Sequence, residues 1–322
     1  ASMSHVAWDG FAHHDTIFPL FLFIAGVSFP YSVAKQRAGG MSEGRMYAKI
    51  VRRGLTLVVL GMVYNGLFKL DFENLRIASV LGRIGLAWSI AAVLYLNFGV
   101  KTRAAIAVAV LAGYGALSAL VAAPDAAGAG PLTFEGNLAG YIDRQFLPGK
   151  LIYGSFDPEG LLSTVPAVVT AMLGMFTGEF VRRSDIRGGR KTLWMAAAAA
   201  ALLAAGLAFS GVLPVNKKLW SSTFVCVVGA YSLGMFALFY YLIDVRGWRR
   251  WTLFFRVVGL NSITIYLAQR IVGFGRISDF FLGGIASKCP EAVAAVISSA
   301  GYVAVCWLFL YFLYRKNVFL KV

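Results

Sequence analysis

The chain has 322 residues, of which 59% are hydrophobic and only 14% are charged, against about 25% charged residues in ordinary soluble domains. This composition excludes a soluble globular protein and indicates a polytopic membrane protein. The net charge of +15 would suit a nucleic-acid ligand, but its distribution along the chain is that of a topology signal. No nucleic-acid partner is therefore expected.

Nine apolar runs are long enough to cross a hydrocarbon core, which takes on the order of 20 residues per helix. In chain order they are residues 15–34, 54–70, 77–98, 104–123, 160–181, 193–213, 219–243, 253–273 and 291–314. The longest polar connection, residues 124–159, is too short and too rich in Gly and Pro to bury a core of its own. The sequence therefore predicts an all-α transmembrane helix bundle with nine visible spans, forming a single domain over residues 1–322.

The basic residues predict the orientation of this bundle. Assigning the loops alternately to the two faces gives one face two thirds of the 30 basic residues and only four acids. Basic loops stay in the cytoplasm, so the visible N-terminus is expected to be extracytoplasmic and the C-terminus cytoplasmic. Nothing before the first run could carry this N-terminus across the bilayer. We therefore expect a preceding helix and ten spans in the intact protein, with nine native spans as the alternative.

One polar cluster lies at the mouth of the first run, on the expected outer face. It comprises the segment His5-Val-Ala-Trp8-Asp9-Gly and, after it, Asp15. Polar chemistry at a bilayer boundary is costly and usually functional. His13 and His14 precede Asp15, but adjacent histidines diverge and rarely chelate one ion, so no metal is expected.

A second cluster lies in the loop of residues 153–166 on the same expected face. Asp157 could N-cap a helix that begins at Pro158, with Glu159 in its first turn. Capping alone accounts for this loop. Two carboxylates and an imidazole on one face would also suit general-base activation of an amine or hydroxyl nucleophile.

Polar residues inside the apolar runs give weaker signals. Arg83 lies a turn or two into its run, so it needs an acidic or anionic partner unless its side chain reaches the membrane interface. The three cysteines, Cys226, Cys289 and Cys306, follow no metal-ligand spacing, and two of them lie within apolar runs. None of them is expected to be catalytic.

Several of these segments, taken together, resemble the heparan-alpha-glucosaminide N-acetyltransferase family and its bacterial relatives. The resemblance is carried by the two outer clusters and by later blocks at residues 78–85, 214–223 and 259–266. These motifs occur in matching order over most of the chain. The resemblance implies a transmembrane acetyltransferase that moves an acetyl group from cytoplasmic acetyl-CoA to an amino sugar or glycan on the outer side. It also implies that the family's first helix is missing from this chain.

The resemblance also suggests roles for individual residues. The family's catalytic histidine lies in the segment matched by His5, so His5 is expected to be catalytic and Asp15 to orient it. Whether His5 is acetylated or acts as a base stays open. The residues expected to bind the acceptor are Trp8, Asp9, Asp157, Glu159 and Asn261. The residues expected to bind the phosphates of CoA are Arg52, Arg53, Arg83, Arg182 and Arg256.

Two other functional classes remain open. An amino-sugar transporter would need inverted repeats around interrupted helices, and no convincing internal repeat is present. A non-catalytic subunit of a larger membrane complex could use aromatic stretches such as residues 239–241 as contacts. Compact loops favour a bacterial inner membrane. Besides membrane lipid, the expected partners are the amino-sugar or glycan acceptor and, as an open alternative, further copies in a homo-oligomer.

Overall fold

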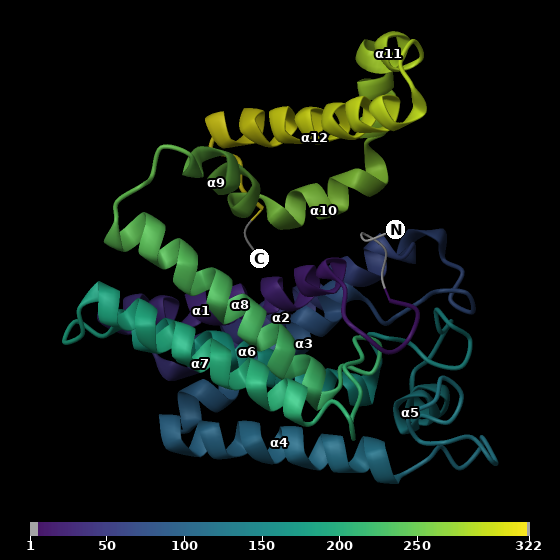
Figure 1. Ribbon diagram of the computed structural model, residues 1–322, viewed down its shortest axis with the longest axis vertical. Helices are drawn as coiled ribbons and strands as arrows, with labels where there is room; N and C mark the ends of the chain where they lie inside the picture. The colour runs from purple at the N-terminus through teal and green to yellow at the C-terminus, as the bar shows by residue number, and fades with distance from the viewer. Residues whose placement is uncertain (1–5, 321–322) are drawn as a thin grey trace. The chain divides into compact units, whose positions relative to one another are not determined.

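The computed structural model describes residues 6–320, and helices connected by loops make up this part of the chain (Figure 1). It contains twelve α-helices, which confirms the predicted all-α class. The chain divides into two compact units, Ala1–Arg246 and Gly247–Val322, called here the first and the second unit. Each unit is described by itself.

The first unit contains eight α-helices and three short helical turns. The α-helices are α1 (Ile17–Ala38), α2 (Glu43–Tyr64), α3 (Val80–Asn97), α4 (Val100–Leu120), α5 (Leu138–Phe146), α6 (Leu161–Arg182), α7 (Gly188–Ala208) and α8 (Ser222–Tyr240). The 3-10 turn η1 (His13–Thr16) precedes α1, and the 3-10 turn η2 (Leu67–Lys69) follows α2. The π-helical turn η3 (Tyr241–Val245) continues α8. The short α5 lies beside the loops at one end of the unit (Figure 1).

Helix α6 forms the centre of the first unit and packs against α1, α3, α4 and α8. Its contact with α1 depends on small residues, because helices in lipid gain most from close backbone approach. A Cβ atom at Gly26 of α1 would lie 2.2 Å from the Ala171 carbonyl oxygen, and one at Gly174 of α6 would lie 2.0 Å from that of Phe23. Gly178 meets Val27 in the same register. The two helices therefore run parallel, and both begin at the same end of the unit.

The second unit contains α9 (Thr252–Leu260), α10 (Ser262–Ile271), α11 (Phe274–Ala286) and α12 (Glu291–Arg315). Its small core is formed by Ala268, Phe274 and Cys306. Trp307 of α12 stacks on Phe254 of α9, with ring centroids 5.7 Å apart.

Seven helices of the described chain are long and apolar enough to span a membrane, by length and composition. They correspond to seven of the nine predicted runs. The runs at 54–70 and 253–273 have no such helix, so the expected count of nine spans is corrected to seven for the described chain. The run at 253–273 is divided at Asn261, whose amide donates to the Val318 carbonyl oxygen and accepts from the Thr264 hydroxyl. An Asn side chain that bonds locally in this way competes with continuous helix.

The run at 54–70 corresponds to α2, but the helix begins eleven residues earlier, at Glu43. Ser42 before it is extended, and Glu43 in the first turn complements the helix dipole. Arg and Lys are good helix formers, so the basic segment continues the helix. Arg52 and Arg53, expected in a loop, therefore lie in the interior of α2.

Candidate functional site

The loops predicted to share the outer face meet at one end of the first unit. Because α1 and α6 run parallel, Asp15 and the Asp157 loop lie at the same end. Basic residues gather at the other end, where Arg103 donates to Glu179 at 2.7 Å and Arg182 to the Pro30 carbonyl oxygen at 3.0 Å. The acidic cluster at the first end is the candidate functional site.

Asp15 is almost fully buried and forms an ion pair with Lys217 from the loop before α8. The Lys217 Nζ atom lies 3.3 Å from Asp15 Oδ1, and Asp15 Oδ2 accepts the Ala12 backbone N–H at 3.1 Å. Burial lowers the pKa of Lys217, and the charge of Asp15 offsets part of this shift. A lysine with a lowered pKa beside a carboxylate is typical of functional sites.

Asn216 holds the loop that carries Lys217. Its side-chain oxygen accepts the Leu219 backbone N–H at 2.9 Å, and its amide donates to Asp9 Oδ1 at 3.1 Å. The loop is thus tied to the segment of residues 6–10, where Gly10 N–H also donates to the Val215 carbonyl oxygen. Asn216 and Lys217 are site residues that the sequence analysis missed, although they fall in one of the family-like blocks.

Arg76 bridges the two predicted carboxylates of the second cluster. Its guanidinium donates to both Asp157 oxygens, at 2.6 and 2.7 Å, and also to Glu159. Although burial lowers the pKa of Arg76, the hydrogen bonds and charges of these carboxylates raise it overall. Asn65 positions this segment by donating to the carbonyl oxygens of Arg76 and Ala78. Sequence reasoning missed Arg76 because its partners lie about 80 residues away.

Asp143 of α5 performs the capping predicted for Asp157. Helix α6 begins at Leu161 rather than Pro158, and the Leu161 N–H donates to Asp143 Oδ1 at 2.9 Å. Asp143 also accepts the Asp157 N–H. Asp157 Oδ1 accepts from the Glu159 N–H in its own loop and from the Arg76 guanidinium. Burial raises the pKa of Asp143 to about 6. The predicted cap at Asp157 is therefore wrong, because a carboxylate from another helix satisfies the start of α6.

Arg83 of α3 lies at this same end, not with Arg52 and Arg53. It is 2% exposed and donates to the Ser163 hydroxyl and, at 3.3 Å, to that of Thr164. Its guanidinium carbon lies 4.9 Å from the ring centroid of Trp220. Its Nη1 atom is buried without a hydrogen-bond partner among the described residues.

Trp220 connects the two polar clusters. One neighbour of its ring is Arg83, and another is Phe18 of α1, whose centroid is 4.9 Å away. Trp220 adopts a left-handed backbone conformation with φ of 52°, which is uncommon for a bulky residue and marks local strain. The loop that pairs Lys217 with Asp15 thus also places an aromatic face on Arg83.

An aromatic cluster anchors the segment that follows His5. Trp8 packs against Phe134 and Phe156, with centroids 5.2 and 5.6 Å away, and its indole N–H donates to the Leu132 carbonyl oxygen. Lys218 Nζ lies 4.4 Å from the Tyr153 ring. His5 itself lies outside the described residues. Of the predicted residues, Trp8, Asp9, Asp15, Asp157, Glu159 and Arg83 come together at this end.

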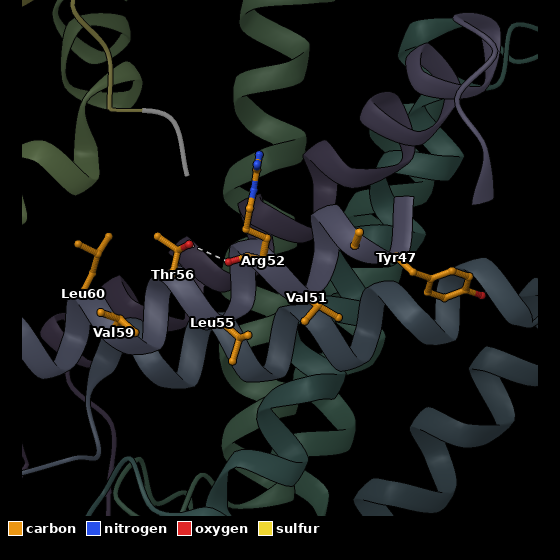
Figure 2. Close-up of a pocket in the computed structure, with 8 residues that line it drawn as sticks. Tyr47, Val51, Arg52, Leu55, Thr56, Val59 and Leu60 are labelled. Carbon is orange, nitrogen blue, oxygen red and sulfur yellow. Dashed lines mark hydrogen bonds between the residues drawn. The ribbon is translucent and has the colours of Figure 1, made fainter. Parts of the chain in front are cut away.

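The other predicted arginines lie apart from this cluster. Arg53 is half-buried over the Trp88 ring, 4.3 Å from its centroid, and its Nε atom has no hydrogen-bond partner in the described chain. Arg52 extends away from α2 beside a groove of about 700 Å³ lined by this helix (Figure 2). Arg256 and Asn261 belong to the second unit. In the described part of the chain, no three His, Cys, Asp or Glu side chains form a metal-binding group.

The fold and this site define a helical membrane protein with buried ion pairs at one end of its bundle. Residues 1–211 match the family model described as heparan-alpha-glucosaminide N-acetyltransferase, catalytic. The chain therefore belongs to this N-acetyltransferase family. The matched range contains Asp15, Arg76, Arg83, Asp143 and the Asp157 loop.

Two mammalian relatives are similar over nearly the whole chain. The human heparan-alpha-glucosaminide N-acetyltransferase is 27% identical over 375 residues, covering 99% of this chain and 55% of the human protein. The mouse protein of the same name is 26% identical over 372 residues, which cover 99% of this chain and 56% of the mouse protein. The chain spans about half the length of these curated relatives.

Proposed function

We propose that this chain is a transmembrane acetyltransferase that transfers an acetyl group from acetyl-CoA to the amine of an amino sugar or glycan. The observation that carries this proposal is the match of residues 1–211 to the catalytic region of an N-acetyltransferase family. The buried charges of the candidate site fall almost entirely in that range. Both relatives are named N-acetyltransferases.

In the proposed reaction, the acceptor nitrogen bonds to the acetyl carbonyl carbon, the carbon–sulfur bond breaks and CoA leaves as a thiol. His5 either removes the proton from the acceptor amine or carries the acetyl group between the two substrates. Either role requires a neutral imidazole, which histidine readily provides near pH 7. Asp15, ten residues along the chain from His5, supplies a fixed charge together with its ion-pair partner Lys217. Asp9, Trp8, Asp157 and Glu159 are proposed to bind the acceptor.

The donor is proposed to bind from the cytoplasmic face of a bacterial inner membrane, with the described N-terminal segment extracytoplasmic. Phosphates of CoA prefer guanidinium partners. Arg53 suits this role because its guanidinium lies over the Trp88 ring and its Nε atom has no hydrogen-bond partner among the described residues. Arg52, Arg182 and Arg256 are further candidates, and Asn261 remains a candidate for the acceptor.

The test is acetyl transfer from radiolabelled acetyl-CoA to a panel of amino sugars by the purified protein. His5→Ala should lower the rate by at least about 100-fold, the scale of lost acid–base catalysis. His13→Ala is the matched control, because His13 is an exposed histidine close to the start of the first helix, and the variant should retain most activity.

Two outcomes would contradict the proposal. Absence of both acetyl transfer and CoA hydrolysis above the His5→Ala level would favour a non-catalytic subunit. Uptake of an amino sugar into proteoliposomes without acetyl-CoA would favour a transporter.

A further inference from the structure

A cavity of about 470 Å³ lies between α3, α4 and α6 in the first unit. Its walls are mostly apolar and include Leu86, Ile90, Val110, Val168 and Met172. This volume falls within the range of about 300–1,000 Å³ that is usual for small-molecule sites. These five apolar residues lie outside the candidate site described above.

Three of the polar residues that line the cavity belong to the candidate site. Arg83, Glu159 and Thr164 all line it. Arg83 is 2% exposed and its Nη1 atom has no acceptor within residues 6–320, while Glu159 contributes a carboxylate that already pairs with Arg76. An unsatisfied buried guanidinium N–H is costly, so a ligand oxygen near Arg83 would relieve that cost. The Arg83 guanidinium can donate hydrogen bonds and the Glu159 carboxylate can accept them. Together they suit the polar head of a ligand that carries both oxygen atoms and an amine.

The cavity opens toward the outside of the bundle along one side. Leu86, Ile90, Leu161 and Val165 line it and are each between 41% and 49% exposed. From Arg83 to Leu94 the wall follows α3 for about 16 Å at 1.5 Å per residue. This length is about half of a hydrocarbon core of roughly 30 Å, so the wall matches one leaflet. A chain could enter it sideways from the lipid.

We propose that this cavity holds the single apolar chain of a lipid-linked amino sugar, whose head reaches Arg83 and Glu159. This inference rests on the proposed function and narrows the acceptor to a membrane-anchored glycan. The apolar length and lateral opening select the chain, while the Arg83 donor and the Glu159 carboxylate select the oxygen atoms and the amine of the head. A water-soluble acceptor would leave the apolar length of the cavity without a function.

The binding test uses a probe in which glucosamine is joined through a phosphate to one saturated chain carrying a photoactivatable diazirine. The protein is labelled in vesicles, and the cross-linked peptides are identified by mass spectrometry. We expect cross-links in α3, α4 and α6. Val110→Trp and Val165→Trp place an indole ring in the space proposed for the chain, so each should lower labelling about tenfold, which corresponds to about 1.4 kcal/mol of binding free energy.

Val108→Trp is the matched control, because Val108 is on the same helix as Val110, is 68% exposed and does not line the cavity. It should change labelling less than about twofold. A lipid with the same chain and a phosphocholine head should compete less well than unlabelled probe. Labelling that spreads over the lipid-facing helices, including α7, and ignores Val110→Trp and Val165→Trp would overturn the proposal.

A second measurement separates this inference from the proposed function. The wild-type protein should acetylate the glucosaminyl lipid faster than free glucosamine. Equal rates for the two acceptors would overturn the lipid-linked acceptor while leaving an acetyltransferase. If neither is acetylated, the proposed function fails, and the labelling pattern still decides whether the cavity binds the lipid.

Discussion

At the scale of single residues, the candidate site contains partly buried ion pairs, in each of which an aspartate is the buried partner. Asp15 with Lys217, and Arg76 with Asp157 and Glu159, are joined by residues far apart in the chain. Removing one partner of a buried pair leaves a charge without compensation, which is worse than removing both. Each pair can therefore be examined by a single and a double substitution.

Lys217→Met should destabilise the protein by up to about 3 kcal/mol, because it leaves the Asp15 carboxylate buried without its cation. The double variant Asp15→Asn with Lys217→Met should recover part of this loss. The measurement is the unfolding temperature in detergent, followed by intrinsic fluorescence. Lys218→Met is the control, since Lys218 lies over the exposed Tyr153 ring, and it should cost less than about 1 kcal/mol. A double variant as unstable as the sum of its parts would contradict the pairing.

Asp143 should make the stability of the outer loops depend on pH. Its pKa is about 6 in the folded protein, above its ordinary value of 3.8, so the folded state binds the proton more tightly. The contribution of the Asp143 carboxyl to the free energy of unfolding is then fully present below pH 3.8 and is lost as the pH rises through about 6. At about 1.4 kcal/mol per pKa unit, the loss is about 3 kcal/mol at most.

The pH dependence is measured as the unfolding temperature of the wild type and of Asp143→Asn between about pH 3.5 and about pH 7, a range that includes both the ordinary pKa of the carboxyl and its pKa in the folded protein. The wild type should lose stability across this range, and the variant should lack that component. Asp125→Asn serves as the control, because Asp125 is exposed and Arg144 lowers its pKa. Parallel profiles for the wild type and Asp143→Asn would contradict the assignment.

At the scale of helices, the contact between α1 and α6 decides which residues meet at the site. Its glycines let the two backbones touch, and the parallel register brings Asp15 to the same end as the Asp157 loop. The residues of this contact are therefore expected to control the site although none of them is charged.

Gly174→Ala should separate α1 from α6, because the new Cβ atom would lie 2.0 Å from the Phe23 carbonyl oxygen. The expected cost is about 3 kcal/mol, with a loss of the proposed acetyl transfer. The control is Gly113→Ala in α4, where a Cβ atom meets nothing within 4 Å and where alanine should stabilise the helix by up to about 1 kcal/mol. Equal unfolding temperatures for the two variants would show that this contact is not tight.

At the scale of the whole molecule, charge distribution predicts how the protein lies in the membrane. The basic end of the first unit carries Arg103, Arg182 and Arg183, and the opposite end carries the site. Basic loops remain cytoplasmic, so the site should face outward.

Cysteine labelling in intact bacterial cells tests this orientation. After Cys226, Cys289 and Cys306 are replaced by alanine, a single cysteine is introduced by Thr133→Cys or by Ser184→Cys. A membrane-impermeant maleimide should label Thr133→Cys from outside and Ser184→Cys only after the cells are opened. The reverse pattern would refute the predicted orientation.

The sequence alone was sufficient to predict the class, the family and most helix positions. Hydropathy is a local property, so seven predicted runs became helices able to span a membrane, and ordered motifs predicted the family that residues 1–211 match. Helix ends were harder to predict where local polar chemistry competed, as at Asn261 within its run and at the start of α2.

Only the tertiary structure decided which polar residues meet. The bridge from Arg76 to Asp157 and Glu159, the cap that Asp143 supplies to α6, and the Asp15–Lys217 pair all join distant segments. Arg83 belongs to the outer cluster rather than to the basic end for the same reason. Such pairings depend on how α1 and α6 pack, because a charge finds its partner through the register of packed helices and not through its neighbours in the chain.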